Sequence, residues 1–97
     1  MEIEYDAYVG DVGVEIILDV ATNISGATLR QIKYKKPISG TLGTWSATEK
    51  TATSIVHVTQ KDDLNEAGIW KLQAYVEKST WGLHGEIENF KVGGSLG

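Results

Sequence analysis

The side chains that could support metal chemistry in this sequence are two histidines and a nearby glutamate. His57 and His84 are the only histidines, and Glu86 follows His84 by two positions. A zinc site made of His57, His84 and Glu86 needs three ligands that converge at about 2.0 to 2.2 Å from the metal. Since a histidine beside a glutamate on a strand surface is more often a solvated pair, the spacing does not favour zinc.

An acidic loop offers a second possible site, and its oxygen-bearing residues are Asp62, Asp63, Asn65 and Glu66. Calcium takes six to eight oxygen ligands. Capping of a single helical turn over residues 61–66 explains the same side chains without a metal. The hydroxyl-rich stretch 41–59 has no neighbouring His–Asp pair to activate a nucleophile. We therefore expect no metal, no cofactor and no enzymatic activity.

The segment that follows this loop has the clearest structural pattern in the chain. Gly68 marks a corner. After it, one face of the expected strand carries Trp70, Leu72, Ala74 and Val76, and the other face carries Ile69, Lys71, Gln73, Tyr75 and Glu77. A period of two is typical of a strand with one buried face. The pattern predicts a late sandwich strand with Trp70, Leu72 and Val76 as core anchors.

Shorter alternating runs, separated by turn residues, cover the rest of the chain. The expected strands are residues 3–9, 14–20, 28–35, 44–49, 54–59 and 85–92, with 77–83 completing a hairpin. We expect the 28–35 strand either to carry a bulge near Arg30 and Gln31 or to twist between two environments, with a stop at Pro37, and we expect core positions at Val14, Ile16, Leu18 and Ile87. This spacing predicts an all-β fold, an immunoglobulin-like antiparallel β-sandwich of about seven strands with an N-terminal strand or arm.

The length of 97 residues suits one domain. We assign residues 1–92 to a single immunoglobulin-like sandwich, with 1–9 as an arm or edge strand and 93–97 as a flexible Gly-rich tail. The chain has no cysteine, which excludes disulfides. Its apolar runs are far shorter than the roughly 20 residues that span a bilayer, so we expect no membrane partner. Acidic residues after Met1 argue against a secretory leader and for a cytoplasmic origin.

Charge is distributed unevenly along the chain. The formal net charge is −4, which argues against a nucleic-acid partner. The first nineteen residues hold only acidic charges, at Glu2, Glu4, Asp6, Asp11, Glu15 and Asp19. The main basic cluster contains Arg30, Lys33, Lys35 and Lys36. Two interpretations stay open: solvated strand faces, or opposed patches that join neighbouring copies.

Several motifs resemble a known protein family. They are VGDVG at 9–13, ISGAT at 24–28, IKYKKP at 32–37 and, most distinctive, DLNEAGIWKLQAYVE at 63–77 with Gly85 and Glu86 behind it. Together they resemble the immunoglobulin-like N-terminal domain of tailed-bacteriophage baseplate upper proteins. The resemblance covers residues 9–92 and implies a structural virion protein without catalytic residues, made in the host bacterial cytoplasm. Such a protein would be a baseplate or tail adaptor, a neck protein or a head decoration protein.

Two kinds of partner are compatible with these features. As a virion component, the chain would form a homo-oligomer or bind other virion proteins. The candidate contact residues are Ile3, Tyr5, Tyr8, Arg30, Lys33, Lys35, Lys36 and Trp81. The alternative is a module that binds carbohydrate or a host receptor, in which Trp81 at a hairpin tip stacks on a surface glycan, helped by Tyr8 or Tyr75.

Overall fold

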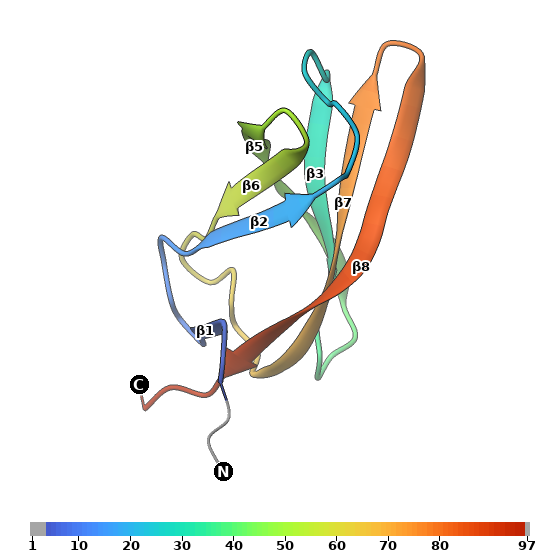
Figure 1. Cartoon of the computed structure of the whole chain (residues 1–97). Coiled ribbons are helices and arrows are strands. Elements are labelled where there is room, and N and C mark those ends of the chain that lie inside the picture. Colours follow the sequence, from blue (N-terminus) through green and yellow to red (C-terminus); the bar gives the residue numbers. More distant parts are fainter. Residues whose placement is uncertain (1–3, 97) are drawn as a thin grey trace.

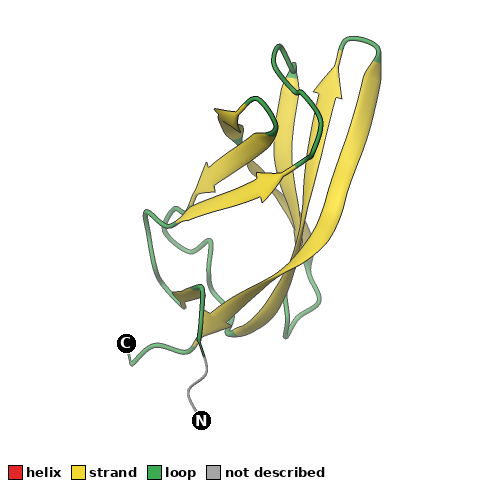
Figure 2. Cartoon of the chain, in the orientation of Figure 1, coloured by secondary structure: helices red, strands yellow, loops and turns green. Residues whose placement is uncertain are grey.

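The computed structural model describes residues 4–96, and this part of the chain consists of strands and loops (Figures 1 and 2). The eight strands are β1 (Ala7–Tyr8), β2 (Glu15–Asp19), β3 (Leu29–Lys35), β4 (Leu42–Ser46), β5 (Thr48–Thr51), β6 (Ser54–Val58), β7 (Gly68–Lys78) and β8 (Trp81–Gly93). The predicted all-β fold is confirmed.

The strands form two sheets that pack as a sandwich. The larger sheet has the order β1-β8-β7-β3-β4, and the smaller has the order β2-β6-β5. Neighbouring strands are antiparallel except β1, which pairs in parallel with the end of β8. The predicted N-terminal arm therefore contributes a short edge strand that pairs within its own chain, while Ile3 lies outside the described residues.

Trp70 lies at the centre of the core with none of its surface exposed. Its ring stacks on Trp45 at a centroid distance of 5.7 Å, and Tyr34 lies 5.5 Å from it. The indole Nε1–H donates to the Glu66 carbonyl at 2.9 Å, so the buried polar atom is satisfied. Leu72 and Val76 are buried on the same face of β7, as predicted.

A bulge in β8 reverses the expected orientation of Ile87. Gln73 pairs with Ile87, but Tyr75 pairs with His84, so β8 carries one extra residue between these pairs. An extra residue shifts the alternation, and every later side chain changes face. Phe90 consequently packs against the core, whereas Ile87 points outward and is 64% exposed. The prediction of Ile87 as a core residue is wrong for this reason.

The structure differs from the prediction in two strands, the segment 28–35, for which a bulge was one of the two expectations, and the segment 44–49, which was expected to be one strand. β3 pairs without a register shift, because Arg30 takes an inward position and its guanidinium reaches Glu49 of β5 at 3.5 Å. Segment 44–49 divides into β4 and β5, which belong to different sheets. The chain crosses between sheets at Ala47, whose N–H bonds to the Arg30 carbonyl.

Two further predictions of local structure are wrong. Residues 61–66 form turns rather than a helical turn, because the Asp63 carboxylate accepts from the Gln60 N–H and lies 2.8 Å from the His57 ring. Gly93 belongs to β8 and not to a tail, since the Val9 N–H donates to its carbonyl at 2.9 Å. The Pro37 stop is confirmed, as β3 ends at Lys35.

Glu66 fastens the β3–β4 connection to the loop before β7. Its carboxylate accepts from the N–H groups of Ile38 and Ser39, at 2.9 and 3.0 Å, and from the Ser39 hydroxyl at 2.7 Å. These bonds, those from Ser39 first, and the Lys36 charge lower the pKa of Glu66. A carboxyl with a lowered pKa stabilises the fold above its unfolded pKa, and this stability is lost as pH falls through the folded pKa.

We expect Glu66→Gln to lower the free energy of unfolding most at neutral pH. The difference between the variant and the natural chain should shrink as pH falls from about 4.3, the ordinary pKa of Glu, through the lowered pKa of the folded state, below which both side chains are neutral. Urea unfolding at several pH values measures this difference. Glu86→Gln, at an exposed position, is the control and should show no such trend. A difference that stays constant with pH would contradict the role of the Glu66 charge.

Candidate functional site

The outer face of the five-stranded sheet carries four lysines, and we call it the lysine face. Lys33 and Lys35 project from β3, Lys71 from β7 and Lys91 from β8, all on the side away from Trp70. The ion pairs in residues 4–96 involve Arg30, Lys50 and His57, so none of them neutralises a lysine of this face. The face is a positive surface on a chain of net negative charge.

Two of these lysines stand directly opposite each other. Lys35 of β3 is the register partner of Lys71 of β7. Side chains at such positions have Cβ atoms about 5 Å apart, and like charges there destabilise a sheet. Lys71 Nζ donates to Asn89 Oδ1 at 2.7 Å, a neutral acceptor that leaves its charge uncompensated. An anionic group placed between Lys35 and Lys71 would relieve their repulsion.

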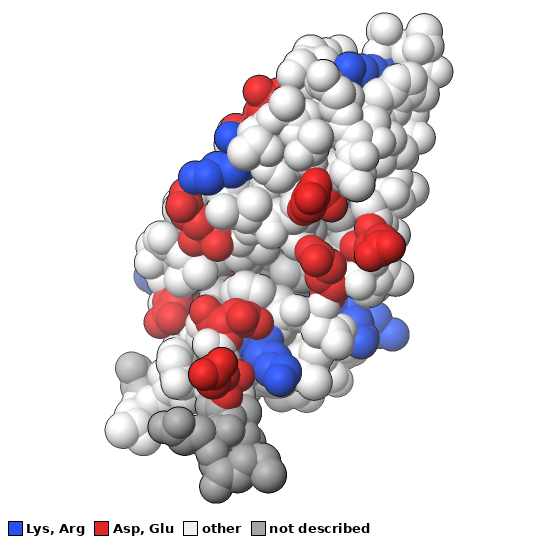
Figure 3. Space-filling view, in the orientation of Figure 1, with Lys and Arg blue, Asp and Glu red and all other residues white. Residues whose placement is uncertain are grey.

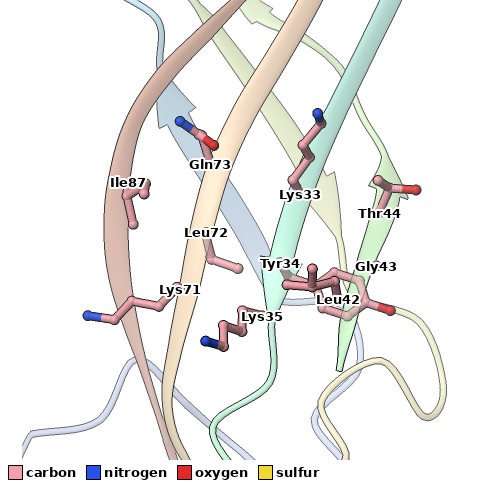
Figure 4. Close-up of a pocket in the computed structure, with 10 residues that line it drawn as sticks. All are labelled: Lys33, Tyr34, Lys35, Leu42, Gly43, Thr44, Lys71, Leu72, Gln73 and Ile87. Carbon is pink, nitrogen blue, oxygen red and sulfur yellow. The ribbon is translucent and has the colours of Figure 1, made fainter. Parts of the chain in front are cut away.

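An open groove of about 760 Å³ runs across this face (Figure 4). In the close-up, Lys33 and Lys35 come from β3, Lys71 and Gln73 from β7, and Ile87 from β8. Leu42 of β4 lines it as well and is 75% exposed. The groove thus has lysines on its two central strands, flanked by apolar side chains at Leu42 on one side and Ile87 on the other. Protein interfaces combine apolar and charged groups, so a partner could contact both.

One end of the lysine face is held rigid by a polar cluster. The Tyr75 hydroxyl donates to Glu77 Oε2 at 2.6 Å, and Lys33 Nζ lies 4.6 Å from the Tyr75 ring centroid. His84 Nε2 is 3.0 Å from Lys33 Nζ. The hydrogen bond to Glu77, followed by desolvation, raises the pKa of Tyr75. Tyr75 therefore remains a neutral donor and positions Lys33 beside the groove.

A second hollow, of about 340 Å³, opens between β2 and β8, and we call it the acidic slot. Carboxylates from three segments line it, namely Asp6, Glu15 and Glu88. Apolar atoms of Ile17 and Phe90 also contribute to its walls. In the space-filling view of this side, acidic side chains gather over β2 and along β8 (Figure 3). The free edge of β2 borders the slot, since β2 pairs only with β6 in the described chain.

The structure divides the predicted basic cluster between two sides of the large sheet. Lys33 and Lys35 belong to the lysine face, whereas Arg30 points inward to Glu49. Lys36 Nζ lies 5.9 Å from the Trp70 ring centroid, on the core side. Alternation along β3 explains why Arg30 faces away from Lys33 and Lys35, because successive side chains point to opposite faces, and Lys36 follows the end of the strand.

The aromatic candidates occupy three different environments. Tyr5 precedes β1 and Tyr8 belongs to it; both are exposed, their ring centroids are 5.6 Å apart, and Tyr8 lies against Gly93. Trp81 begins β8 and is only half-exposed, because it packs against the core. Lys78 Nζ lies 5.6 Å from its ring centroid. None of these rings lines the groove of the lysine face.

The histidines lie on different sheets and do not converge on one site. His57 of β6 stacks on Trp45, at a centroid distance of 4.8 Å, and approaches Asp63, whereas His84 is on the lysine face. Asp63 and Glu66 of the acidic loop are engaged by separate protein groups. Across residues 4–96, no group of three or more His, Cys, Asp or Glu side chains could hold a metal ion.

Sequence reasoning missed four residues of the lysine face, namely Leu42, Lys71, Ile87 and Lys91. The alternation in β7 does place Lys71 opposite Trp70, which is a usable signal. The pairing of Lys71 with Lys35 depends on strand register, and the outward orientation of the Ile87 side chain depends on the β8 bulge. Neither is visible in a single sequence.

Comparison with known proteins gives no relative to guide the assignment. No protein-family model, curated protein or solved structure matches the chain. Within residues 4–96, no helix is long and apolar enough to cross a membrane. The lysine face and the acidic slot therefore have to carry the functional assignment.

Proposed function

We propose that the chain is a non-enzymatic, immunoglobulin-like module of a bacteriophage virion that acts through protein–protein contacts on its lysine face. The observation that carries the proposal is the groove in which exposed Leu42 and Ile87 lie beside the unneutralised Lys35–Lys71 pair. Such a surface is costly in an isolated domain, whereas a partner with carboxylates and apolar side chains would cover both features.

The strand order supports the immunoglobulin-like part of this proposal. The smaller sheet pairs the second, sixth and fifth strands, and the larger pairs the eighth, seventh, third and fourth. This is the pairing of a B-E-D sheet facing a G-F-C sheet extended by one further strand. The short β1 joins the last strand in parallel and extends the larger sheet at its other edge.

The virion part rests on the sequence resemblance in residues 63–77. This segment supplies the Glu66 contact, the Gly68 corner and most of β7, which lies in the middle of the larger sheet. A baseplate or tail adaptor, a neck protein and a head decoration protein all need a rigid module with an exposed contact face. Glycan binding through Trp81 is less compatible with the packing of that ring against the core.

The proposal predicts that the chain is a fixed component of purified phage particles. Quantitative mass spectrometry of gradient-purified particles should find it at constant copy number, and immunogold labelling should locate it. A phage genome carrying Lys35→Glu and Lys71→Glu should yield particles that have lost most of the chain. Lys61→Glu with Lys78→Glu changes the net charge equally, outside the lysine face, and should leave incorporation unchanged.

Two results would overturn the proposal. One is absence of the natural chain from purified particles. The other is normal incorporation of the chain that carries both reversals on the lysine face, provided that circular dichroism shows the same fold for both variants.

A further inference from the structure

We infer that the partner of the lysine face is the acidic slot of a second copy of this chain, in a head-to-tail contact. This inference rests on the proposed function and names the partner at the same surface. Its two halves are the Lys33, Lys35, Lys71 and Lys91 ammonium groups on one copy and the Asp6, Glu15 and Glu88 carboxylates on the next.

The two surfaces have matching composition. The groove of the lysine face combines cationic groups with exposed Leu42 and Ile87, and the slot combines carboxylates with apolar atoms of Ile17 and Phe90. Each surface therefore offers apolar area beside charged groups, and the charges are of opposite sign. Complementary potentials of this kind set orientation and suppress wrong partners.

The carboxylates of the slot are only partly engaged within their own chain. Glu15 forms an exposed contact with Lys50 at 3.4 Å, and exposed pairs of this type contribute little. Asp6 accepts from the Lys91 N–H at 2.8 Å, which fixes its position at the rim. Glu88 sits opposite Leu72 in the register, beyond the cover of the smaller sheet, and points its charge into the slot.

One copy cannot join its own two surfaces. The lysine face is on the side of the large sheet that points away from the smaller sheet, whereas the slot borders β2 of the smaller sheet. Figure 1 shows β2 in front of β3 and β7, and Figure 4 shows the large sheet from the opposite side. The contact must therefore be made between different copies.

A two-fold dimer through the lysine face is disfavoured by its charge. An isologous contact would bring the Lys35–Lys71 row of one copy against the same row of the other. A contact between the lysine face of one copy and the acidic slot of the next avoids this repulsion. It leaves one lysine face and one acidic slot free at the two ends of the assembly. Such a contact closes into a ring when the rotation permits, and otherwise extends as a filament.

The molecule is large enough for this contact. Its principal extents are 45 × 26 × 23 Å, so the broad sides exceed the roughly 800 Å² that each partner contributes to a standard interface. The contact should depend on salt, because the screening length falls from about 10 Å at 0.1 M to about 3 Å at 1 M ionic strength.

The test is the mass of the full chain in solution, measured by light scattering after size exclusion. The natural chain should exceed the monomer mass of 10.6 kDa at low salt and return toward it in about 1 M salt. The variant with Lys35→Glu and Lys71→Glu should stay monomeric, and so should the variant with Glu15→Lys and Glu88→Lys. Lys61→Glu with Lys78→Glu should assemble like the natural chain.

Mixing the two monomeric variants gives the decisive measurement. In the mixture, the lysine face made acidic in one variant can bind the slot made basic in the other. The unchanged slot of the first variant can bind the unchanged lysine face of the second. An equimolar mixture should therefore recover the assembled mass. Thermal melting of each variant alone verifies that it is folded. Failure of the mixture to assemble, with folded variants, would overturn the head-to-tail contact.

The two proposals fail in different ways. A natural chain that is monomeric at low salt and high concentration would overturn self-association, while loss of the lysine-face variant from particles would still support docking to another virion protein. A chain that assembles in solution but is absent from particles would overturn the virion function and leave the head-to-tail contact standing.

Discussion

Replacing Trp70 by alanine is expected to remove about 3 to 5 kcal/mol from the free energy of unfolding, the usual cost of deleting a large buried aromatic side chain. The ring is completely buried, stacks on Trp45 and contacts Tyr34. Its loss would also leave the Glu66 carbonyl without its indole donor. A domain with a total stability of about 5 to 15 kcal/mol would lose a large part of it.

Urea unfolding followed by tryptophan fluorescence and far-UV dichroism measures this loss. Trp81→Ala is the matched control, because the Trp81 ring is half-exposed and its removal should cost much less. Trp70→Phe should give an intermediate loss, since it keeps an aromatic ring but removes the Nε1–H bond. A Trp70→Ala loss below about 1 kcal/mol would contradict its central place in the core.

Gly68→Ala should be the second most damaging single substitution. Gly68 has a φ of +133°, a region that residues with a side chain rarely adopt. A Cβ there would lie 2.7 Å from Cβ of Pro37, inside contact distance. Strained backbone alone costs about 1 to 3 kcal/mol, and the overlap adds to it because the proline ring cannot rotate away.

Unfolding in urea again gives the magnitude, and Gly94→Ala is the control. A Cβ added at Gly94 would meet open space, and the φ of Gly94 is outside the left-handed region, so its substitution should be close to neutral. If Gly68→Ala were as stable as Gly94→Ala, the corner at the start of β7 would have to be flexible enough to move away from Pro37.

The sequence predicted those parts of the fold that local periodicity determines. Alternation in β7 located Trp70, Leu72 and Val76, and alternation in β2 located Ile16 and Leu18. Prediction from alternation failed where one extra residue in a strand exchanges the inward-facing and outward-facing positions. The bulge in β8 reverses Ile87, and this reversal depends on pairing with β7 rather than on any local preference.

The candidate site could be predicted only in part for the same reason. Lys33 and Lys35 were identified because they are close in sequence, but Lys36 and Arg30 were grouped with them although alternation sends these two to the core side. The partner of Lys35 comes from a strand 36 positions later in the chain. Cross-strand neighbours follow from register, which no single sequence displays.

The pairing of β1 with the end of β8 has a practical consequence for handling the molecule. The rings of Tyr5 and Tyr8 lie against Gly93, so the two ends of the described chain leave the domain at the same pole (Figure 1). The hairpin tip between β7 and β8 is at the opposite pole. A short linker could join the ends, and new ends could be opened at residues 79–80, giving a circular permutant. In the chain without such a permutation, attachment of a probe or a solid support at either end would leave both broad sides of the sandwich accessible.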